Sequence, residues 1–173
     1  MRQSLIAFAA AALVAVPALA APTVGGPAPA FELLDQEGNT RRLEDYSGKW
    51  VVLYFYPKAD TPGCTTESCA FRDNIFAFRA IGAEIVGISL DDVSSQKEFA
   101  EKYSLPFPLL SDAKGTVAES YGVLRNFAVM KMASRETFII APDGTIARHY
   151  EDVDPDEHSA EVLADLKTLV GEG

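Results

Sequence analysis

The feature that most constrains the fold is the apolar run of residues 50–56, along which polar and apolar side chains do not alternate. A strand with one side facing water would alternate, so both faces of this strand must be covered, as in the centre of an α/β sheet. A loop beginning at Pro57 follows, and Pro62-Gly63 then opens a segment with helical periodicity. The sequence therefore predicts a central strand, a loop and a helix in succession.

The chain's two cysteines, Cys64 and Cys69, both fall in this predicted helix. Cys64 lies in the first turn, where free N–H groups and the helix dipole favour a thiolate. It shares a helix face with the apolar residues at positions 71, 75 and 78, whereas Cys69 is rotated by about 140° toward a flank. A thiolate with a second thiol nearby is typical of thiol redox chemistry.

Length and charge limit the class of protein. A chain of 173 residues, 48% of them hydrophobic and 23% charged, is long enough for one domain with a substantial core. The formal charge of −10 argues against binding to nucleic acid or to anionic membranes, and it fits a soluble protein.

The first twenty residues differ from the rest of the chain. Arg2 supplies a positive start, residues 5–20 are apolar and rich in alanine, and Ala18-Leu19-Ala20 matches the small-x-small pattern that a signal peptidase cleaves. The apolar run is shorter than the ~20 residues needed to span a bilayer, which argues against a permanent anchor. We therefore expect residues 1–20 to be a cleaved signal peptide and residues 21–173 to form a single domain exported to the bacterial periplasm.

Two cysteines in an exported protein would ordinarily suggest a structural disulfide. Cα atoms five residues apart in an α-helix are separated by about 8–9 Å, whereas a disulfide requires roughly 4.4–6.8 Å. A bond between these cysteines would need a helical turn to unwind, which argues against a permanent link and is compatible with a bond that forms and breaks during turnover. A metal site is disfavoured because neither cysteine has another cysteine or a histidine at ligand spacing.

The rest of the sequence alternates strand and helix patterns. A hairpin is predicted from residues 31–34 and 40–43. After the helix of residues 62–81, the patterns indicate a strand at 84–90, a helix at 94–103 capped by Ser94 or Ser95, a strand at 107–110, a helix at 115–121, a hairpin at 136–140 and 145–150, and a helix at 156–170. This order predicts a thioredoxin-like α/β fold, with a central mixed β-sheet flanked by helices and an N-terminal β-hairpin.

Two polar residues near Cys64 are candidates for local roles. Thr61 can cap the helix with its hydroxyl group, which would also lie beside the thiol. Glu67 can close a capping box, but as an exposed carboxylate it would oppose formation of the thiolate, so a partner cation is needed. Sites in open α/β sheets form beyond the carboxyl ends of the strands, which places the predicted site at this loop.

The segment around Cys64 resembles the active-site segment of peroxiredoxins. It reads Tyr54-Phe55-Tyr56-Pro57-Lys58-Ala59-Asp60-Thr61-Pro62-Gly63-Cys64-Thr65 and carries the pattern Pro-x-x-x-Thr-x-x-Cys, and the likeness extends from about Val24 to the C-terminus. The chain is most similar to the branch called PrxQ or bacterioferritin comigratory protein. One subgroup of that branch has a second cysteine five residues after the first, which is the position of Cys69.

The resemblance implies roles for residues of this segment. Cys64 would be the peroxidatic thiolate and Cys69 the resolving thiol. Thr61 would hydrogen-bond the peroxide, and Pro57 would shield the thiolate.

Two further residues gain a role from the resemblance. Arg135 matches the family's active-site arginine, and Glu67 matches a position with a supporting hydrogen-bonding role. From the residues alone, Arg135 would be interpreted as a solvated surface charge. It nevertheless opens a predicted strand which, if antiparallel to residues 50–56, begins beside the carboxyl end of that strand.

Residues 125–132 depart from the family, whose members often carry Lys and Gly before the arginine. The segment is unusually apolar for a loop. We expect it to pack against the core under the sheet edge; the alternative is an exposed docking patch for the reductant or for a second subunit.

These features predict a thiol peroxidase that reduces hydrogen peroxide and organic hydroperoxides through a sulfenic acid on Cys64 and a Cys64–Cys69 disulfide. A thioredoxin-like or glutaredoxin-like protein would reduce the disulfide, and no metal, haem, flavin or other cofactor is implied. The rival functions are an exported thiol–disulfide oxidoreductase, which would use Cys-x-x-Cys, and a redox-sensing protein. We expect a monomer, with a dimer as the alternative, and no nucleic-acid or membrane partner after signal cleavage.

Overall fold

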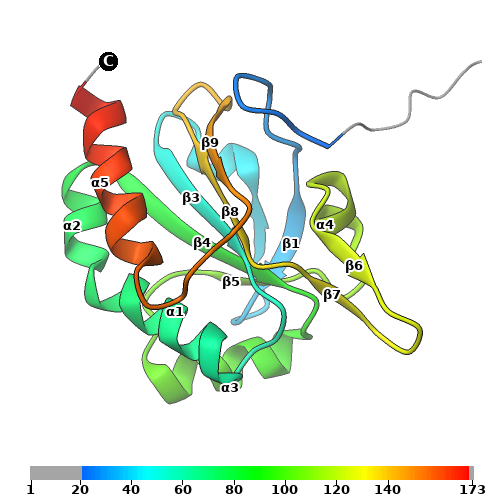
Figure 1. The fold of residues 1–173 in the computed structure, drawn as a ribbon. Coiled ribbons are helices and arrows are strands. Elements are labelled where there is room, and N and C mark those ends of the chain that lie inside the picture. Colours follow the sequence, from blue (N-terminus) through cyan, green and yellow to red (C-terminus); the bar gives the residue numbers. More distant parts are fainter. Residues whose placement is uncertain (1–20, 172–173) are drawn as a thin grey trace, which may run out of the picture.

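A seven-stranded mixed sheet runs through the computed structural model, which describes residues 21–171 (Figure 1). The predicted signal peptide lies outside the described residues. The strand order is β2-β1-β5-β4-β3-β8-β9. The bounds are β1 (Glu32–Asp35), β2 (Thr40–Arg42), β3 (Trp50–Phe55), β4 (Ala83–Ser89), β5 (Leu109–Ser111), β8 (Glu136–Ile140) and β9 (Ile146–Tyr150). The predicted N-terminal hairpin is present as the antiparallel pair of β1 and β2.

Strand β3 lies inside the sheet, parallel to β4 on one side and antiparallel to β8 on the other. Residues 51–56 are all buried. Alternate side chains enter two different cores: Val52, Tyr54 and Tyr56 on one face of the sheet, Val51, Leu53 and Phe55 on the other. The prediction that this strand is covered on both faces is confirmed.

Different helices cover the two faces (Figure 1). Helices α1 (Pro62–Asp73), α2 (Ile75–Ala80), α3 (Val93–Tyr103) and α5 (His158–Gly171) pack on the face of Tyr54. Helix α4 (Thr116–Ser120) and the 3-10 helix η1 (Leu43–Tyr46) pack on the face of Phe55. Within residues 21–171, no helix combines the length and the apolar character needed to cross a bilayer. The predicted α/β class, a mixed sheet flanked by helices, is confirmed.

The helix predicted for residues 62–81 is broken at Asn74 into α1 and α2. Asn74 has φ −97° and ψ 4°, and its side-chain Nδ2 donates a hydrogen bond to the carbonyl oxygen of Ala70 at 3.1 Å. A short amide side chain that bonds to nearby backbone competes with continuation of the helix. The apolar spacing concealed the break because Phe71 and Phe78 still face the same core.

The cap of α3 also differs from the prediction. Asp92, rather than Ser94 or Ser95, is the N-cap residue, and its Oδ1 accepts a hydrogen bond from the backbone N–H of Ser95 at 2.8 Å. The hydroxyl of Ser94 donates to the same oxygen. Asp and Ser are both good N-caps, so residue type alone places the start of a helix only to within a residue or two.

The expectation that residues 125–132 pack against the core is wrong. The chain there forms a separate two-stranded hairpin, β6 (Leu124–Asn126) and β7 (Lys131–Ala133), which projects from the sheet (Figure 1). Its tip exposes Phe127, Val129 and Met130, and Val129 is 93% exposed. Apolar composition did not distinguish a core segment from a projecting hairpin because such a pattern carries no information about distant neighbours.

Candidate active site

Cys64 lies in the first turn of α1, directly beyond the carboxyl end of β3, and is buried. Thr61 is the N-cap residue and Pro62 is the first helical residue, as predicted. The Thr61 hydroxyl accepts no hydrogen bond from the first turn of the helix, however, and it donates to the carbonyl oxygen of Lys58 at 2.9 Å. Its oxygen lone pairs are therefore the part of the hydroxyl available to another group.

Arg135 reaches Cys64 from the neighbouring strand β8, which is antiparallel to β3. It directly precedes β8, whose first residue, Glu136, pairs with Phe55 at the carboxyl end of β3. The guanidinium Nη2 of Arg135 donates to Cys64 Sγ at 3.3 Å. The expected strand is confirmed: β8 is antiparallel to β3 and starts, directly after Arg135, beside the carboxyl end of β3. The interpretation of Arg135 as a solvated surface charge is wrong, because its side chain is only 19% exposed.

Glu67 faces the core, and the capping box predicted for it is absent. Its side chain is fully buried, and its Oε2 accepts a hydrogen bond from Arg135 Nη1 at 2.5 Å. Arg135 is thus the partner cation that the sequence demanded. Burial raises the pKa of Glu67 to about 7, although Arg135 acts in the opposite direction. Because burial favours the uncharged form of Glu67, its carboxyl group offsets the Arg135 charge less fully than an exposed carboxylate would.

Gly63 makes room for this arginine, a requirement that the sequence pattern did not single out. A Cβ atom at position 63 would lie 3.1 Å from Arg135 Nη2 and 3.6 Å from a side-chain carbon of Pro155. The glycine therefore lets the guanidinium lie against the start of the helix. The only sequence signal was a glycine in the first turn of a helix, where its low helix propensity calls for a reason.

Cys69 is half-buried in the same helix, and both thiols are free. The predicted contrast between a core-facing Cys64 and a flanking Cys69 is confirmed. Since both residues are helical, their Cα atoms are separated by about 8–9 Å, beyond the reach of a disulfide. Among residues 21–171, no group of three or more His, Cys, Asp or Glu side chains is placed to bind a metal ion.

The loop between β3 and α1 is anchored at two residues, Ala59 and Asp60, by contacts that the sequence did not indicate. The backbone N–H of Ala59 donates to Asp91 Oδ2 at 2.8 Å. Asp60 has a left-handed φ of 58°, and its carboxylate accepts bonds from Lys102 Nζ and Tyr103 Oη, each at 2.7 Å. These partners lie 32 to 43 positions away in the sequence, outside the range of local patterns. The anchors hold the loop that carries Pro57 and Thr61.

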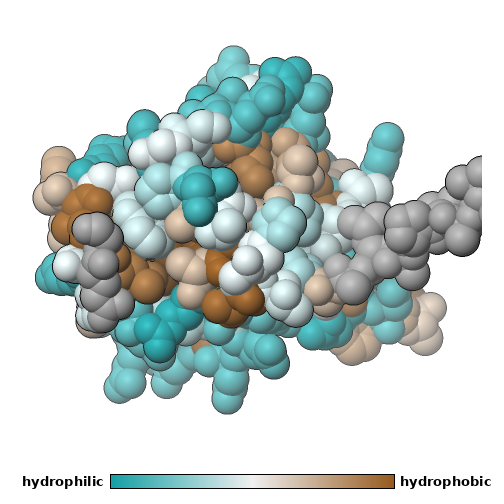
Figure 2. Space-filling model, turned by 90° about the horizontal axis from the view of Figure 1, so that it is seen from above, coloured by the Kyte–Doolittle hydropathy of each residue, from teal (hydrophilic) through white to brown (hydrophobic). Residues whose placement is uncertain are grey.

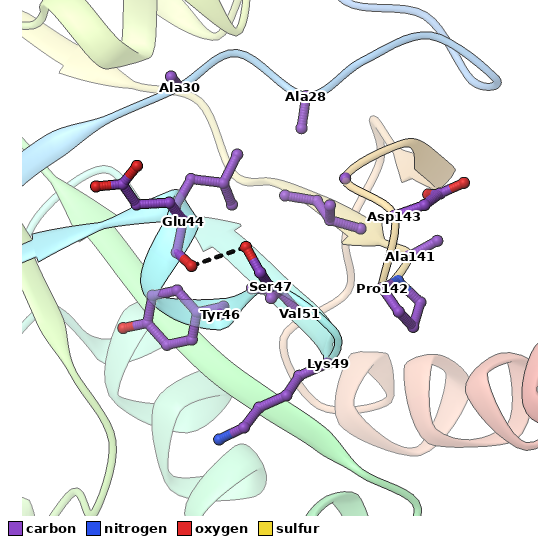
Figure 3. A pocket seen from close by; sticks show the side chains of 13 residues that line it. Ala28, Ala30, Glu44, Tyr46, Ser47, Lys49, Val51, Ala141, Pro142 and Asp143 are labelled. Atoms are coloured by element: carbon purple, nitrogen blue, oxygen red, sulfur yellow. Dashed lines mark hydrogen bonds between the residues drawn. The ribbon is translucent and has the colours of Figure 1, made fainter.

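A cavity of about 270 Å³ lies at the other end of β3, far from Cys64 in the topology. It is lined by Val51 at the start of β3 and by Ala141 and Pro142 after β8, and in Figure 3 the Ser47 hydroxyl donates to the Glu44 carbonyl beside it. Figure 2 views this end of the molecule and shows small apolar areas separated by hydrophilic residues. None of the predicted site residues lines this cavity.

Known proteins share this sequence and fold. Residues 24–149 match the model of the AhpC/TSA family. The chain is 42% identical to peroxiredoxin Bcp of Bacillus subtilis over 150 residues, which cover 84% of this chain and 96% of that protein. It is 43% identical to the chloroplastic peroxiredoxin Q of Sedum lineare over 148 residues, 85% of this chain and 79% of that protein. The crystal structure of peroxidoxin BcpB from Mycobacterium tuberculosis has a TM-score of 0.81 at 42% identity, covering 86% of this chain and 98% of the other.

These likenesses confirm the predicted thioredoxin-like α/β fold and the predicted enzyme class, a thiol-dependent peroxidase. The relatives match nearly the whole of the described part of the chain, including the strand, loop and helix that hold Cys64. The chain therefore belongs to the AhpC/TSA family, as a peroxiredoxin of the branch that contains Bcp and peroxiredoxin Q.

Proposed function

We propose that this peroxidase reduces hydrogen peroxide and organic hydroperoxides at Cys64. The thiolate sulfur bonds to one peroxide oxygen, the O–O bond breaks, and the other oxygen leaves as hydroxide or alkoxide, which takes up a proton. The product on the protein is a sulfenic acid. The observation that supports this most is the contact of Arg135 Nη2 with Cys64 Sγ at the start of a helix, because both the cation and the helix dipole stabilise a thiolate.

The neighbouring residues have separate proposed roles. Arg135 holds the thiolate and orients the peroxide. Thr61 offers its hydroxyl oxygen to the peroxide proton, since its own proton is donated to the loop backbone. Pro57 begins the loop and shields the thiolate from water, and Glu67 holds the arginine in place through Nη1.

Cys69 is proposed to resolve the sulfenic acid. Its thiol attacks the Cys64 sulfur, a disulfide forms, and water leaves. The first turns of α1 must unwind for this step because the two cysteines are too far apart in the helix. A thioredoxin-like or glutaredoxin-like dithiol protein would then reduce the bond by thiol–disulfide exchange.

The setting of the reaction is also a proposal. The signal-like pattern of residues 1–20 supports export, with the bacterial periplasm as the destination. We propose a monomer acting without nucleic-acid or membrane partners. The alternative is that the exposed apolar tip of the β6–β7 hairpin binds the reductant or a second copy of this chain.

Peroxide consumption over many turnovers tests the proposal against its rivals. With a dithiol reductant in excess, residues 21–173 should consume many equivalents of hydrogen peroxide per protein. A thiol–disulfide oxidoreductase or a redox sensor would not speed up peroxide consumption beyond the rate of the dithiol reductant alone. Insulin reduction, measured in parallel, should stay at background; rapid insulin reduction together with peroxide consumption no faster than with the reductant alone would overturn the proposal.

A further inference from the structure

The end of α1 is tied to α5 by a part-buried triangle of hydrogen bonds around Ala70, the residue after Cys69. The carbonyl oxygen of Ala70 accepts bonds from Asn74 Nδ2 and from Ser159 Oγ, both at 3.1 Å, and Asn74 Nδ2 also donates to Ser159 Oγ at 3.2 Å. The backbone N–H of Asn74 reaches the same carbonyl at 3.2 Å. Ser159 is 2% exposed. We call Ala70, Asn74 and Ser159 the α1–α5 clamp.

The clamp is itself fixed to the sheet. His158, the first residue of α5, hydrogen-bonds through Nε2 to Thr137 Oγ1 of β8 at 2.8 Å. Its ring meets that of Phe71 edge-on, with centroids 5.7 Å apart. Burial lowers the pKa of His158 to about 4, so this anchor stays neutral near pH 7. The Ala70 carbonyl is thus linked to the central sheet through Ser159 and the adjacent His158, without a contact to either cysteine.

The first turns of α1 are held differently, by contacts that the reaction itself disturbs. Arg135 bonds both Cys64 and Glu67. Conversion of the Cys64 thiolate into a sulfenic acid removes the negative charge that faces Nη2, which weakens this support. The first turn of α1 therefore loses part of its support on oxidation, whereas none of the contacts of the clamp involves a cysteine.

We propose that the α1–α5 clamp is the fixed end of the unwinding that lets Cys64 reach Cys69. This inference rests on the proposed disulfide step. Cys69 stays beside the clamped Ala70 carbonyl, and the turn carrying Cys64 opens toward it. Asn74 and Ser159 are then positioning residues, which keep the opening from spreading into α2 and the core around Phe78.

Hydrogen exchange of the reduced and disulfide forms tests the clamp. In a helix each backbone N–H bonds to the carbonyl oxygen four residues earlier. When residues 62–69 unwind, the N–H groups up to residue 73 therefore lose their partners and should exchange faster. The N–H of Asn74 bonds to Ala70 and should be the first to stay protected. In the wild-type disulfide form, α2 should exchange as slowly as in the reduced form. Fast exchange of α2 in that form would overturn the inference, because the opening would then pass through the clamp.

The variant Ser159→Ala removes one donor and one acceptor of the triangle. In the disulfide form, exchange of residues 75–80 should speed up by about fivefold or more. In the reduced form the intact first turns of α1 also support α2, so the change there should stay below about twofold. A merely structural serine would raise exchange equally in both redox states, and that result would contradict the proposal.

A matched control and a second variant complete the test. Ser120→Ala also removes a serine hydroxyl that donates to a helix carbonyl, but in α4 on the other face of the sheet, and should leave residues 75–80 unchanged. Asn74→Ala removes the other donor and should reproduce the redox-dependent pattern; an equal effect in both states would again contradict the clamp. The disulfide form is prepared both with peroxide and with diamide. If only diamide forms the bond, the proposed peroxidase step fails while the clamp is still tested.

Discussion

Among the single residues of the site, the proposed reactive thiol of Cys64 is fully buried. Cys64 has no exposure to solvent, and a charge in such a place must be paired. Arg135 supplies the pairing, and Glu67 holds the arginine without fully cancelling its charge, because burial raises the pKa of Glu67 to about 7. The sequence predicted the place of the thiol and of Arg135. It misplaced Glu67, because local spacing cannot reveal a partner 68 positions away.

Removal of the arginine tests this pairing. Arg135→Ala should lower the second-order rate constant with hydrogen peroxide by about 10- to 100-fold. This range corresponds to the free energy of one hydrogen bond to a charged group. The thiolate absorbance of Cys69→Ser protein at pH 7 should fall when Arg135→Ala is added. Reduction of the preformed disulfide should proceed as in the wild type.

Arg148→Ala is the matched control for this change. It removes an arginine of neighbouring β9 that pairs with Asp165, outside the site. Its rate constant with peroxide should equal that of the wild type. A rate constant for Arg135→Ala that also equals the wild type would show that the family role does not apply to this residue.

At the scale of elements, strand β3 and the start of α1 were predictable because their signals are local. Seven apolar residues predicted a doubly covered strand, and Pro62 marked the first turn of the helix. The break at Asn74 was not predictable, since it depends on hydrogen bonds to Ala70 and to Ser159 of α5. The exposure of the β6–β7 hairpin was likewise decided by which strands lacked a place in the main sheet.

Helix α1 should lose stability when the disulfide forms. The bond cannot coexist with the helical spacing of the cysteines, so one or two turns must open, at about 1 kcal/mol per hydrogen bond. Hydrogen exchange should accelerate across residues 62–72 on oxidation, while residues 51–55 stay protected. Slower exchange across residues 62–72 would identify the bond as a structural link and would refute the local unwinding.

For the whole molecule, the buried groups Glu67 and His158 change the free energy of unfolding in opposite directions as pH changes. Burial raises the pKa of Glu67 from 4.5 to about 7, so its contribution is full below pH 4.5 and is lost as pH rises through 7. Burial lowers the pKa of His158 from 6.5 to about 4, so its contribution is full above pH 6.5 and is lost as pH falls through 4. Between pH 7 and pH 5 the two effects therefore act in opposite directions in the wild type.

Removing one of the two groups should reveal the effect of the other on the pH dependence of the free energy of unfolding. For Glu67→Gln, the free energy of unfolding should fall by about 2 kcal/mol between pH 7 and pH 5 relative to the wild type, because the His158 effect is no longer offset. For His158→Phe, it should rise by a similar amount over the same range. Urea unfolding at the two pH values measures both; parallel pH profiles for the two variants and the wild type would contradict the assigned shifts.

The apolar tip of the β6–β7 hairpin has no part in the proposed reaction. Phe127, Val129 and Met130 remain exposed on the tip of the β6–β7 hairpin in an otherwise acidic protein. Their role in binding the reductant or a second copy stays a prediction.

The proposed reaction requires Cys64 to react with peroxide and Cys69 to resolve the product. One equivalent of hydrogen peroxide is added to Cys64→Ser and to Cys69→Ser protein with a sulfenic-acid trap, and the intact masses are read. Cys69→Ser should gain the mass of the trapped adduct in a fast reaction, while Cys64→Ser should keep its mass and consume no peroxide. Equal labelling of the two variants, or labelling of Cys64→Ser alone, would contradict the proposed reaction.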